Sequence, residues 1–399
     1  MHKQQENVDI VIVGAGIVGL LLSLAVSYKK KSLKILLIDN INIDKDEEYA
    51  LDLDKRSIAL SYYSIEFLKA LGLDTFLSEH IQPMQEIYIS DKGHCAKMRL
   101  HSDEVGIPYL GGVIELSVLQ SYLLAQVKKL DNVQYDFSVD VKNMHVYQDY
   151  IEVIIPNAVI KTKLLVGADG IHSMVKNRFS FDEVCFDYQQ YALVTNVEVT
   201  KTESIAFERF TKEGLVALLP LNKNRYAVVW VGDIKNIKPL SLMNKDLFIH
   251  YLYQEFGDYI SDLIDVGKMQ LFPLHLHYVK NSIAHRTVLL GNSAQNLHPV
   301  AGQGFNLALR DIKRLTKVID EYNDVQLGQY SMLAEYEDSR RNDKTEIIRI
   351  THYLVQLFSN SSRLCALGRN MGLISLSLMP QLRRRLIHLF CGKKYDIRF

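Results

Sequence analysis

The segment 291–306 contains the residues with the clearest capacity for chemistry. Gly302, Gly304 and Pro299 mark backbone that turns sharply or lies against another group with no side chain in between. A helical run follows, and the amides of its first turn are donors with a partial positive charge. This arrangement suits an anion or the electron-rich edge of a ring. His298 offers a proton shuttle or a hydrogen-bond partner for the turn, and we favour the second role because the sequence shows no partner for proton transfer.

A second glycine-rich segment follows the first apolar strand pattern of the chain. Gly14, Gly16 and Gly19 have the spacing GxGxxG, a helical run comes next, and a second strand ends at Asp39. In such a unit the first glycine permits a tight turn, the second lets a pyrophosphate approach the backbone, and the third lets the helix pack on the strand. The pyrophosphate would lie at the helix N-terminus, and Asp39 would accept hydrogen bonds from ribose hydroxyls. The motif therefore predicts dinucleotide binding.

A third segment lies roughly midway between the other two. A buried strand pattern over residues 164–167 ends in a turn that contains Asp169 and Gly170. The Asp169 carboxylate can accept hydrogen bonds from the hydroxyl groups of a bound nucleotide, while Gly170 keeps the turn close to the strand. An ordinary strand that ends in an Asp-Gly turn is the alternative, and the position between two further glycine-rich motifs weakens it.

Together the three segments resemble the flavin-binding motifs of the FAD-dependent aromatic hydroxylases, and residues 297–306 resemble the ubiquinone-biosynthesis branch of that family. The cofactor-binding residues that the resemblance implies are Gly14, Gly16, Gly19, Asp39, Arg56, Gln120, Asp169, Gly170, Asn292, Gly302, Gly304, Phe305 and Asn306. Arg56 would lie along the flavin, and Glu115 or Gln120 would reach the ribityl chain.

Two positions depart from the family pattern. Lys176 stands where the family often has arginine, so we expect weaker or different nucleotide contacts there. Asn292 stands where the wider family has aspartate, and its amide can still accept from a ribityl hydroxyl.

The resemblance implies a reaction in which the cofactor carries the chemistry. NAD(P)H reduces FAD, the reduced ring adds O2 at C4a to give a hydroperoxide, and an electron-rich phenol takes the distal oxygen. Gly302, Gln303 and Gly304 would stabilise negative charge on the ring, with His298 and Pro299 shaping the turn. The expected substrate is a polyprenylated methoxyphenol of ubiquinone biosynthesis, handled within a multi-enzyme assembly. A sister hydroxylase for another ring position or a soluble phenol, and a non-catalytic flavin-binding scaffold, are the alternatives.

These motifs need an α/β framework to position them. Runs of β-branched and aromatic residues from 191 to 232 predict antiparallel strands, and the resemblance makes this sheet the substrate-binding layer over the flavin. Its expected lining is Phe207, Arg209, Leu218 and Pro220, with sheet core and a surface arginine as the alternative. We expect a Rossmann-like FAD-binding domain from segments 1–75, 111–180 and 278–322, an antiparallel-sheet substrate domain from 76–110 and 181–277, and a helical C-terminal region, 323–399.

The C-terminal region is predicted to be helical. A long amphipathic pattern runs over 330–358, and we expect its charged residues on the outer side; these are Glu335, Glu337, Asp338, Arg340 and Arg341. The segment 373–379 is apolar, and residues 380–399 contain six arginines or lysines and one aspartate. A basic amphipathic tail beside an apolar run indicates a peripheral membrane contact, or else a helix packed on the protein with its arginines in solvent.

Composition limits the remaining functions. Lysine plus arginine equals aspartate plus glutamate at 46 each, so no overall field favours nucleic acid. The four cysteines, Cys95, Cys185, Cys365 and Cys391, lie far apart and predict free thiols in a reducing cytosol rather than disulfides. No metal is expected, because the thirteen histidines form no HExxH motif and His275 and His277 lack an evident third ligand.

The N-terminus bears on localisation. It is polar and enters the first strand directly, so no signal peptide is expected. Residues 10–26 are apolar enough to imitate a membrane span, but their glycine spacing argues against one. We therefore expect a cytoplasmic protein, soluble or peripherally attached to a membrane.

Overall fold

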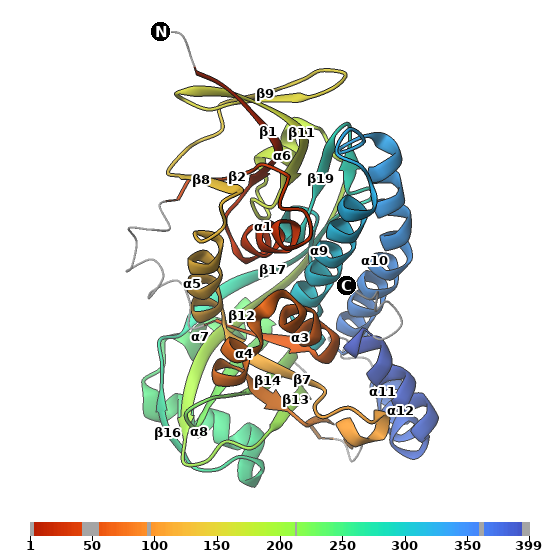
Figure 1. The fold of residues 1–399 in the computed structure, drawn as a ribbon. Coiled ribbons are helices and arrows are strands. Elements are labelled where there is room, and N and C mark those ends of the chain that lie inside the picture. Colours follow the sequence, from red (N-terminus) through yellow and green to blue (C-terminus); the bar gives the residue numbers. More distant parts are fainter. Residues whose placement is uncertain (1–3, 42–55, 94–96, 212–213, 359–362, 393–399) are drawn as a thin grey trace.

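The computed structural model of the protein describes residues 4–41, 56–93, 97–211, 214–358 and 363–392 (Figure 1). One half of the molecule is built on a parallel sheet with the strand order β18-β19-β11-β1-β2-β8. The parallel strands are β1 (Gln4–Val13), β2 (Ile35–Asp39), β8 (Val133–Phe137), β11 (Ala158–Gly167) and β19 (Thr287–Leu289). Strands β9 (Asn143–Val146), β10 (Ile151–Ile154) and β18 (Ile283–Ala284) add antiparallel pairs at its margins. The predicted Rossmann-like arrangement is confirmed.

Helices cover one face of the parallel sheet. They are α1 (Ile17–Lys29), α5 (Leu116–Val127) and α9 (Gln303–Glu321). Their apolar side chains form one continuous core with alternate residues of β1, β2 and β11, among them Ile10, Leu37 and Val166. The opposite face of the sheet packs on β9, β10 and the short helix α6 (Met174–Arg178). Because both faces are covered, the central segments 10–13, 35–38 and 164–167 are apolar and buried throughout, as expected for a parallel sheet.

The second half contains an antiparallel sheet with the order β20-β17-β12-β15-β14-β13-β5-β6. Its strands are β5 (Glu86–Asp91), β6 (Lys97–His101), β12 (Glu183–Val199), β13 (Ile205–Thr211), β14 (Gly214–Leu221), β15 (Arg225–Asp233), β17 (Gln270–Val279) and β20 (Gln295–Asn296), with β16 (Leu263–Val266) paired to β12. The strand pairs predicted within 191–232 are confirmed. The pair β13–β5 is parallel and brings the segment before residue 110 into this sheet.

The two faces of the antiparallel sheet have different neighbours. Helices α7 (Ile234–Ser241) and α8 (Lys245–Phe256) cover one face and share a core with Val197 and Val228. The other face meets Val300 and Val355. It also meets a small sheet of β3 (Ser57–Ser61), β4 (Gln82–Met84) and β7 (Gly111–Glu115), which is followed in space by the helices α3 (Tyr62–Leu68) and α4 (Asp74–His80). This second face is therefore the one turned toward the parallel-sheet half.

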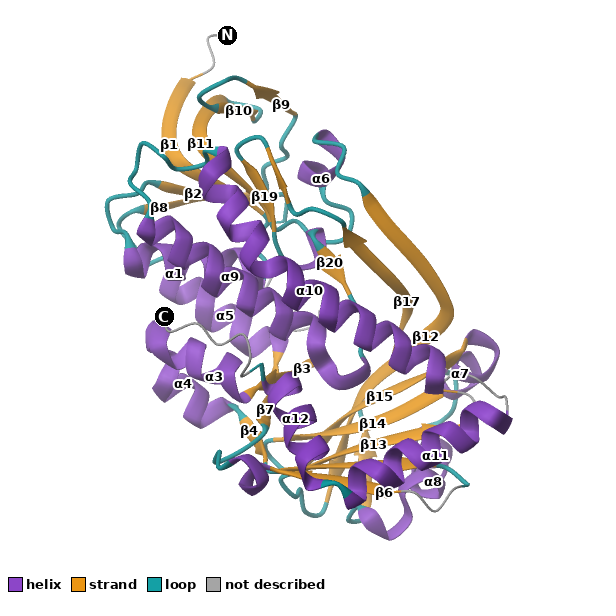
Figure 2. Ribbon diagram, turned by 90° about the vertical axis from the view of Figure 1, so that its right-hand side faces the viewer, coloured by secondary structure: helices purple, strands orange, loops and turns teal. Residues whose placement is uncertain are grey.

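The C-terminal region is helical, as predicted. It consists of α10 (Tyr330–Phe358), α11 (Arg363–Leu378) and α12 (Pro380–Cys391), and α10 runs along both halves of the molecule (Figure 2). Residues 393–399 of the basic tail lie outside the described residues. Within the described ranges, no helix is long and apolar enough to cross a membrane.

The expectation that the charged side chains of α10 face outward is wrong for Glu337 and Arg340, which are buried. Arg340 Nε donates to Asp311 Oδ1 of α9 at 2.7 Å, and Arg340 also pairs with Asp343. Gln295 Nε2 donates to the other Asp311 oxygen at 2.6 Å. The physical reason is that these partners, from separate segments, satisfy the buried charge. The network fixes α10 against α9, the helix that follows the Gly302 loop.

Candidate active site

The predicted motifs meet at the carboxyl edge of the parallel sheet. The Gly14 amide donates to Ile38 O of β2 at 2.7 Å, and the Ala168 amide donates to Val13 O of β1 at 2.7 Å. The carboxyl ends of neighbouring parallel strands lie side by side, so the turns after β1, β2, β11 and β19 are adjacent. Ligands bind at this edge in open α/β sheets. The structure thus brings together motifs that are up to about 290 residues apart in the chain.

The three glycines of the GxGxxG motif differ in their surroundings. A Cβ on Gly14, whose φ is +106°, would lie 2.4 Å from Ala168 O. A Cβ on Gly19 would lie 1.9 Å from Gly14 O, so both residues are required by the packing of the chain on itself. A Cβ on Gly16 would meet nothing within 4 Å in the described chain. The absence of a side chain at Gly16 therefore keeps a space open rather than relieving a contact within the fold.

Helix α1 begins beside this open space. Gly16 is its N-cap, and no side chain caps the first turn among the described residues. Asp39 lies on the other side of the turn, where Oδ2 accepts the Ala15 amide at 2.6 Å and Oδ1 accepts the Ile41 amide at 2.9 Å. Each carboxylate oxygen keeps a further lone pair for a hydroxyl donor. The geometry is compatible with the predicted ribose contact.

The Asp169 side chain joins its own turn to the segment 291–306. Its Oδ2 accepts the Met174 amide at 2.7 Å, at the start of α6, and its Oδ1 accepts the Ser293 hydroxyl at 3.1 Å. Gly170 has a left-handed φ of +80° that keeps this turn tight. The sequence did not indicate the Ser293 bond, since that residue comes more than a hundred positions later.

Gly291 lets the last motif approach α1. Its φ is +59°, and an added Cβ would lie 2.9 Å from the Val18 side chain at the start of α1. The next residue, Asn292, has an exposed side chain at this junction. Asn292 therefore follows a residue that lies against the first turn of α1, the helix whose N-cap is Gly16.

The loop before α9 is held by side-chain hydrogen bonds. Gly302 has a φ of +57°, forms the N-cap of α9, and gives its amide to Pro299 O at 3.0 Å. Asn306 Oδ1 accepts the Ser61 amide at 2.8 Å, and its Nδ2 donates to Ala59 O at 2.9 Å. The Asn306 side chain thus ties the loop to β3, and Phe305 packs on the core of the parallel-sheet half.

The backbone amides in the first turn of α9 are the groups that can donate to the edge of a bound ring. No side chain caps its first turn among the described residues. A Cβ on Gly304 would have only Leu297 Cβ near it, at 4.0 Å, so the side of the helix where a side chain would stand is open at this position among the described residues.

Both ring nitrogens of His298 lie within hydrogen-bond distance of a partner. Its Nδ1 accepts the Val300 amide at 3.2 Å, and its Nε2 faces Gln190 Oε1 at 3.3 Å. The ring is therefore the neutral tautomer with its hydrogen on Nε2. Burial lowers the pKa of His298 to about 3, which keeps the ring uncharged at neutral pH. His298 connects β12 of the antiparallel sheet to the loop that begins at Pro299.

Two of the residues expected along the flavin, Arg56 and Glu115, contact the antiparallel sheet. The Arg56 guanidinium lies 5.1 Å from the centre of the Phe272 ring of β17. Glu115 accepts both Arg225 Nη1 at 2.9 Å and Nη2 at 3.2 Å, so it binds β7 to β15 instead of standing free for a ribityl chain. Gln120 is half-buried on α5. The Arg225–Glu115 pair was not foreseen, because the two residues are far apart in the sequence.

The structure places the four expected substrate residues away from the Gly302 loop. Phe207 and Leu218 are buried with α7 and α8. Arg209 Nε lies 3.7 Å from Glu255 Oε2 of α8, and Pro220 is paired with Tyr226, another member of that core. The alternative reading of sheet core therefore describes them better. The physical reason is the two-residue alternation of a strand, which turns these side chains to the helix-covered face.

On the other face of the antiparallel sheet, the side chains point toward the Gly302 loop. Val194 of β12, Leu219 of β14 and Val229 of β15 are half-exposed although they lie on inner strands. Val194 and Val229 pack beside Val300 of the loop. This apolar surface, opposite the start of α9, is the part of the sheet that can meet a ring.

Comparison with known proteins identifies the family. A model of the FAD binding domain matches residues 7–351.

The chain belongs to this FAD-binding family.

Relatives and solved structures of the family cover nearly the whole chain. Ubiquinone hydroxylase UbiL of Rhodospirillum rubrum is 29% identical over 94% of this chain and 87% of its own length. The mitochondrial ubiquinone biosynthesis monooxygenase COQ6 of Homo sapiens is 23% identical over 95% of this chain and 91% of its own.

Two solved structures show the same fold. The p-nitrophenol 4-monooxygenase PnpA of Pseudomonas putida has a TM-score of 0.77 at 16% identity, covering 99% of this chain and 100% of the other. HpxO of Klebsiella pneumoniae, solved with FAD and uric acid, has a TM-score of 0.73 at 16% identity, covering 98% and 96%.

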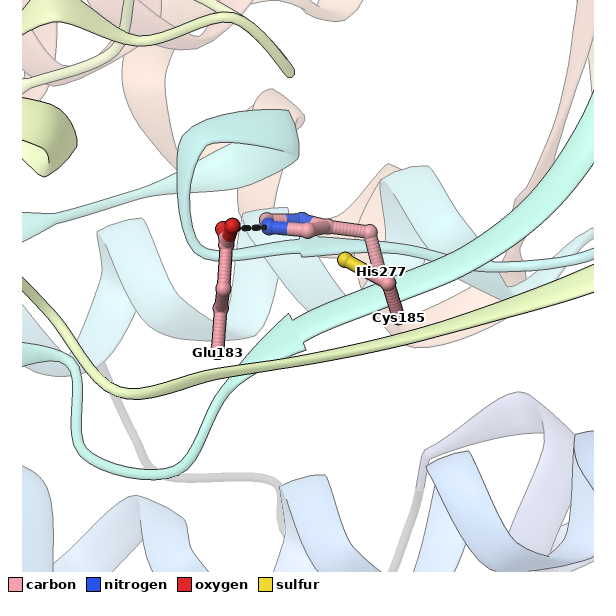
Figure 3. A group of neighbouring side chains, drawn as sticks. All are labelled: Glu183, Cys185 and His277. Atoms are coloured by element: carbon pink, nitrogen blue, oxygen red, sulfur yellow. Dashed lines mark hydrogen bonds and ion pairs between the residues drawn. The ribbon is translucent and has the colours of Figure 1, made fainter.

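One group of side chains in this FAD-binding protein has the composition of a metal site (Figure 3). Glu183, Cys185 and His277 lie on β12 and β17 with their ligand atoms within 4.8 Å of one another. The Lys176 ammonium lies 2.7 Å from Glu183 Oε2 and 2.9 Å from His277 Nε2. Hydrogen bonds from Lys176, and then from His277, hold the pKa of Glu183 below its usual value.

A lysine ammonium thus takes the position that a cation would need. Lys176 is buried here and follows the Asp169 turn, so it fixes α6 on the antiparallel sheet. Cys185 and Cys391 are free thiols, while Cys95 and the Cys365 side chain lie outside the described parts of the chain.

Proposed function

We propose that this protein is an FAD-dependent hydroxylase of ubiquinone biosynthesis that uses NAD(P)H and O2 to hydroxylate the ring of a polyprenylated methoxyphenol. The observation that carries the proposal is the apolar face of Val194, Leu219 and Val229 opposite the start of α9. The names of the relatives, a ubiquinone hydroxylase and ubiquinone biosynthesis monooxygenases, support the reaction class.

The residues present fit an FAD. The open space at Gly16 and the uncapped start of α1 suit its pyrophosphate, since helix N-termini bind anions. Asp39 offers lone pairs to the ribose, and Asn292 offers an amide at the junction of the two turns. When bound, FAD supplies electron transfer and the activation of oxygen.

The chain itself supplies charge stabilisation and geometry. The Gly304 amide and the positive end of α9 would stabilise negative charge on the edge of the ring. Asn306 and His298 keep this loop in place through bonds to β3 and from Val300. Because the loop is already in position, its dipoles do not have to reorganise as charge develops during the reaction. Such preorganisation is usually the largest source of charge stabilisation in an active site.

The apolar sheet face has two further tasks. It would hold the aromatic ring by contacts to Val194, Leu219 and Val229, and it would exclude water from the reacting atoms. NAD(P)H is proposed to bind only transiently, because the sequence has no second GxGxxG motif for a separate nucleotide domain.

A peripheral membrane contact through α11 and α12 is part of the proposal. Ile374, Leu378, Met379 and Leu382 are exposed apolar side chains, and Arg384 is exposed beside them. An apolar surface flanked by cations suits a bilayer with anionic lipids, from which a polyprenyl substrate would come. Partners in a biosynthetic assembly are proposed to meet the same region.

Vesicle sedimentation tests this contact. The wild-type protein is expected to sediment with vesicles rich in anionic lipid, and Leu378→Glu to stay in solution. The matched control is Tyr330→Glu, because Tyr330 is about as exposed as Leu378 but lies at the start of α10, away from α11 and α12. Equal sedimentation of both variants would contradict the contact.

Turnover by the FAD-loaded protein tests the function. NAD(P)H oxidation is expected to increase when a short-prenyl methoxyphenol is added, and mass spectrometry should find a product one oxygen heavier. A hydroxylated product from soluble phenols alone would favour a soluble-phenol hydroxylase. Bound FAD without stimulated oxidation by any phenol would favour the scaffold alternative.

A further inference from the structure

Asn196 lies near the carboxyl end of β12, and its buried side chain makes no hydrogen bond to any residue that the structure describes. Only 6% of the residue is exposed. Neither Oδ1 nor Nδ2 has a partner within the part of the chain that the structure describes. The backbone is satisfied, because Asn196 O accepts the Gly267 amide at 2.8 Å. The unsatisfied group is therefore the carboxamide alone.

The carboxamide faces the FAD-binding half of the molecule. The next residue, Val197, is buried against α7 and α8, so Asn196 points to the opposite face by the alternation of the strand. Its neighbour across the sheet is Ala227, which packs with Ala59 of β3. Ala59 is the residue whose carbonyl binds Asn306 of the Gly302 loop. Asn196 thus lies in the interlayer, which is the space between the antiparallel sheet and the small β3–β4–β7 sheet. The proposed ring site lies in the same interlayer.

A second unsatisfied polar atom faces this interlayer from the other side. Ser57 Oγ on β3 is buried and lacks a hydrogen-bond partner among the described residues. Ser57 is two residues from Ala59 and shares its face of β3, while Ile58 and Leu60 pack into the opposite core. Polar atoms without partners therefore meet the interlayer from both of its walls.

A carboxamide without partners destabilises a folded protein, and an aliphatic residue of similar size would not. The nearest residues on the same face, Val194 and Ala227, are aliphatic, so packing alone does not require an asparagine. Such exceptions among buried polar groups call for a ligand, a water or a functional role. An amide can donate one hydrogen bond and accept another, which matches a phenolic hydroxyl.

We propose that Asn196 is a specificity-determining residue that binds the oxygen substituent of the aromatic substrate. The inference rests on the proposed function and names the polar contact within its apolar site. A site built to hydrogen-bond a hydroxyl rejects the analogue that lacks it, because the buried amide is then left unpaired. Asn196 sets which ring is bound and how it is turned, while the apolar face holds the ring by area alone.

Ligand binding to the FAD-loaded protein tests the proposal without turnover. The probes are a short-prenyl methoxyphenol and the matching methoxybenzene without the hydroxyl, with affinity read from the change in the flavin absorbance spectrum. The wild-type protein should prefer the phenol by about tenfold or more. Asn196→Leu should lose this preference, bind the methoxybenzene as well as the wild type does, and resist urea at least as well.

The outcomes separate the two proposals. If the wild type prefers the phenol and Asn196→Leu keeps that preference, the role of Asn196 is overturned while the proposed function stands. If the wild type binds neither compound, the proposed substrate class fails and the inference fails with it. Asn196→Ala, which removes the amide without adding bulk, gives the same test if the leucine variant is poorly folded. Val194→Ala on the same face is the matched control and should weaken both ligands equally.

Discussion

Replacing Gly16 by valine should remove FAD binding while leaving the fold intact. The side chain at this position would enter a space with nothing within 4 Å in the described chain, at the uncapped start of α1. Gly16 has φ −65° and ψ 179°, which valine adopts without strain. The new methyl groups would occupy the place proposed for the pyrophosphate. The variant therefore separates binding from stability.

The magnitudes follow from these contacts. Losing one or two charge-assisted bonds from amides to phosphate, at about 1.5–3 kcal/mol each, weakens FAD binding by roughly tenfold for one bond at the lower value and by more than about 1,000-fold for two at the higher. In the flavin-free protein, a less favourable N-cap lowers the free energy of unfolding by about 1 kcal/mol at most. The lower conformational entropy of the unfolded chain offsets about half of that loss. Gly19→Ala should behave differently, because its Cβ would lie 1.9 Å from Gly14 O. A loss of about 3 kcal/mol or more is expected there.

The assay compares FAD dissociation constants with urea unfolding of the flavin-free proteins, followed by far-ultraviolet circular dichroism. Gly16→Val should unfold close to the wild type and fail to retain FAD, whereas Gly19→Ala should unfold early. A Gly16→Val protein that binds FAD within about threefold of the wild type would refute the reasoning. A flavin-free Gly16→Val as unstable as Gly19→Ala would do the same.

Three further predictions concern stability. Gly291→Ala should destabilise by about 1–3 kcal/mol, since its φ is +59° and its Cβ would crowd α1; unchanged urea unfolding would contradict this. Arg340→Ala should cost about 3 kcal/mol, because the buried Asp311 and Asp343 would each lose a cation and keep only Lys344 at 3.8 Å and Arg310 at 2.8 Å, and a wild-type midpoint would disprove it. Burial lowers the pKa of His298 from 6.5 to about 3, so the unfolded chain takes up a proton first as the pH falls. The free energy of unfolding should therefore decrease below about pH 6.5, by up to about 1.4 kcal/mol per pH unit, and level off near pH 3. His298→Gln should remove that part of the slope, and an unchanged pH profile would count against it.

The sequence predicted the framework because its signals are local. The strand–turn–helix around Gly14 and the helix over 330–358 follow from spacing and periodicity within short windows. The meeting of the three motifs follows from the rule that parallel strands share a carboxyl edge.

The orientation of the antiparallel sheet could not be predicted in the same way. Residues 214–218 of β14 are all buried, since helices cover one face and the FAD-binding half covers the other. The alternation that normally marks the inner face is then absent from the sequence. Phe207 and Leu218 consequently looked as suitable for a pocket as Val194 and Leu219.

Long-range polar pairs were also beyond the reach of the sequence. The burial of Arg340 depends on Asp311 from another helix, and Glu115 is bound by Arg225 from another sheet. Asn196 sits within a strand that was correctly predicted, yet its importance depends on the absence of partners in three dimensions. Such properties come from packing, which a single sequence does not display.

The most direct test of the central claim is turnover of the FAD-loaded protein under ¹⁸O₂, with NADH or NADPH and a short-prenyl methoxyphenol. The account predicts a ring-hydroxylated product that carries one labelled oxygen atom from O2. Bound FAD with stimulated NAD(P)H oxidation but only unlabelled phenol and hydrogen peroxide, across ring substrates of different substitution, would contradict the assignment as a hydroxylase.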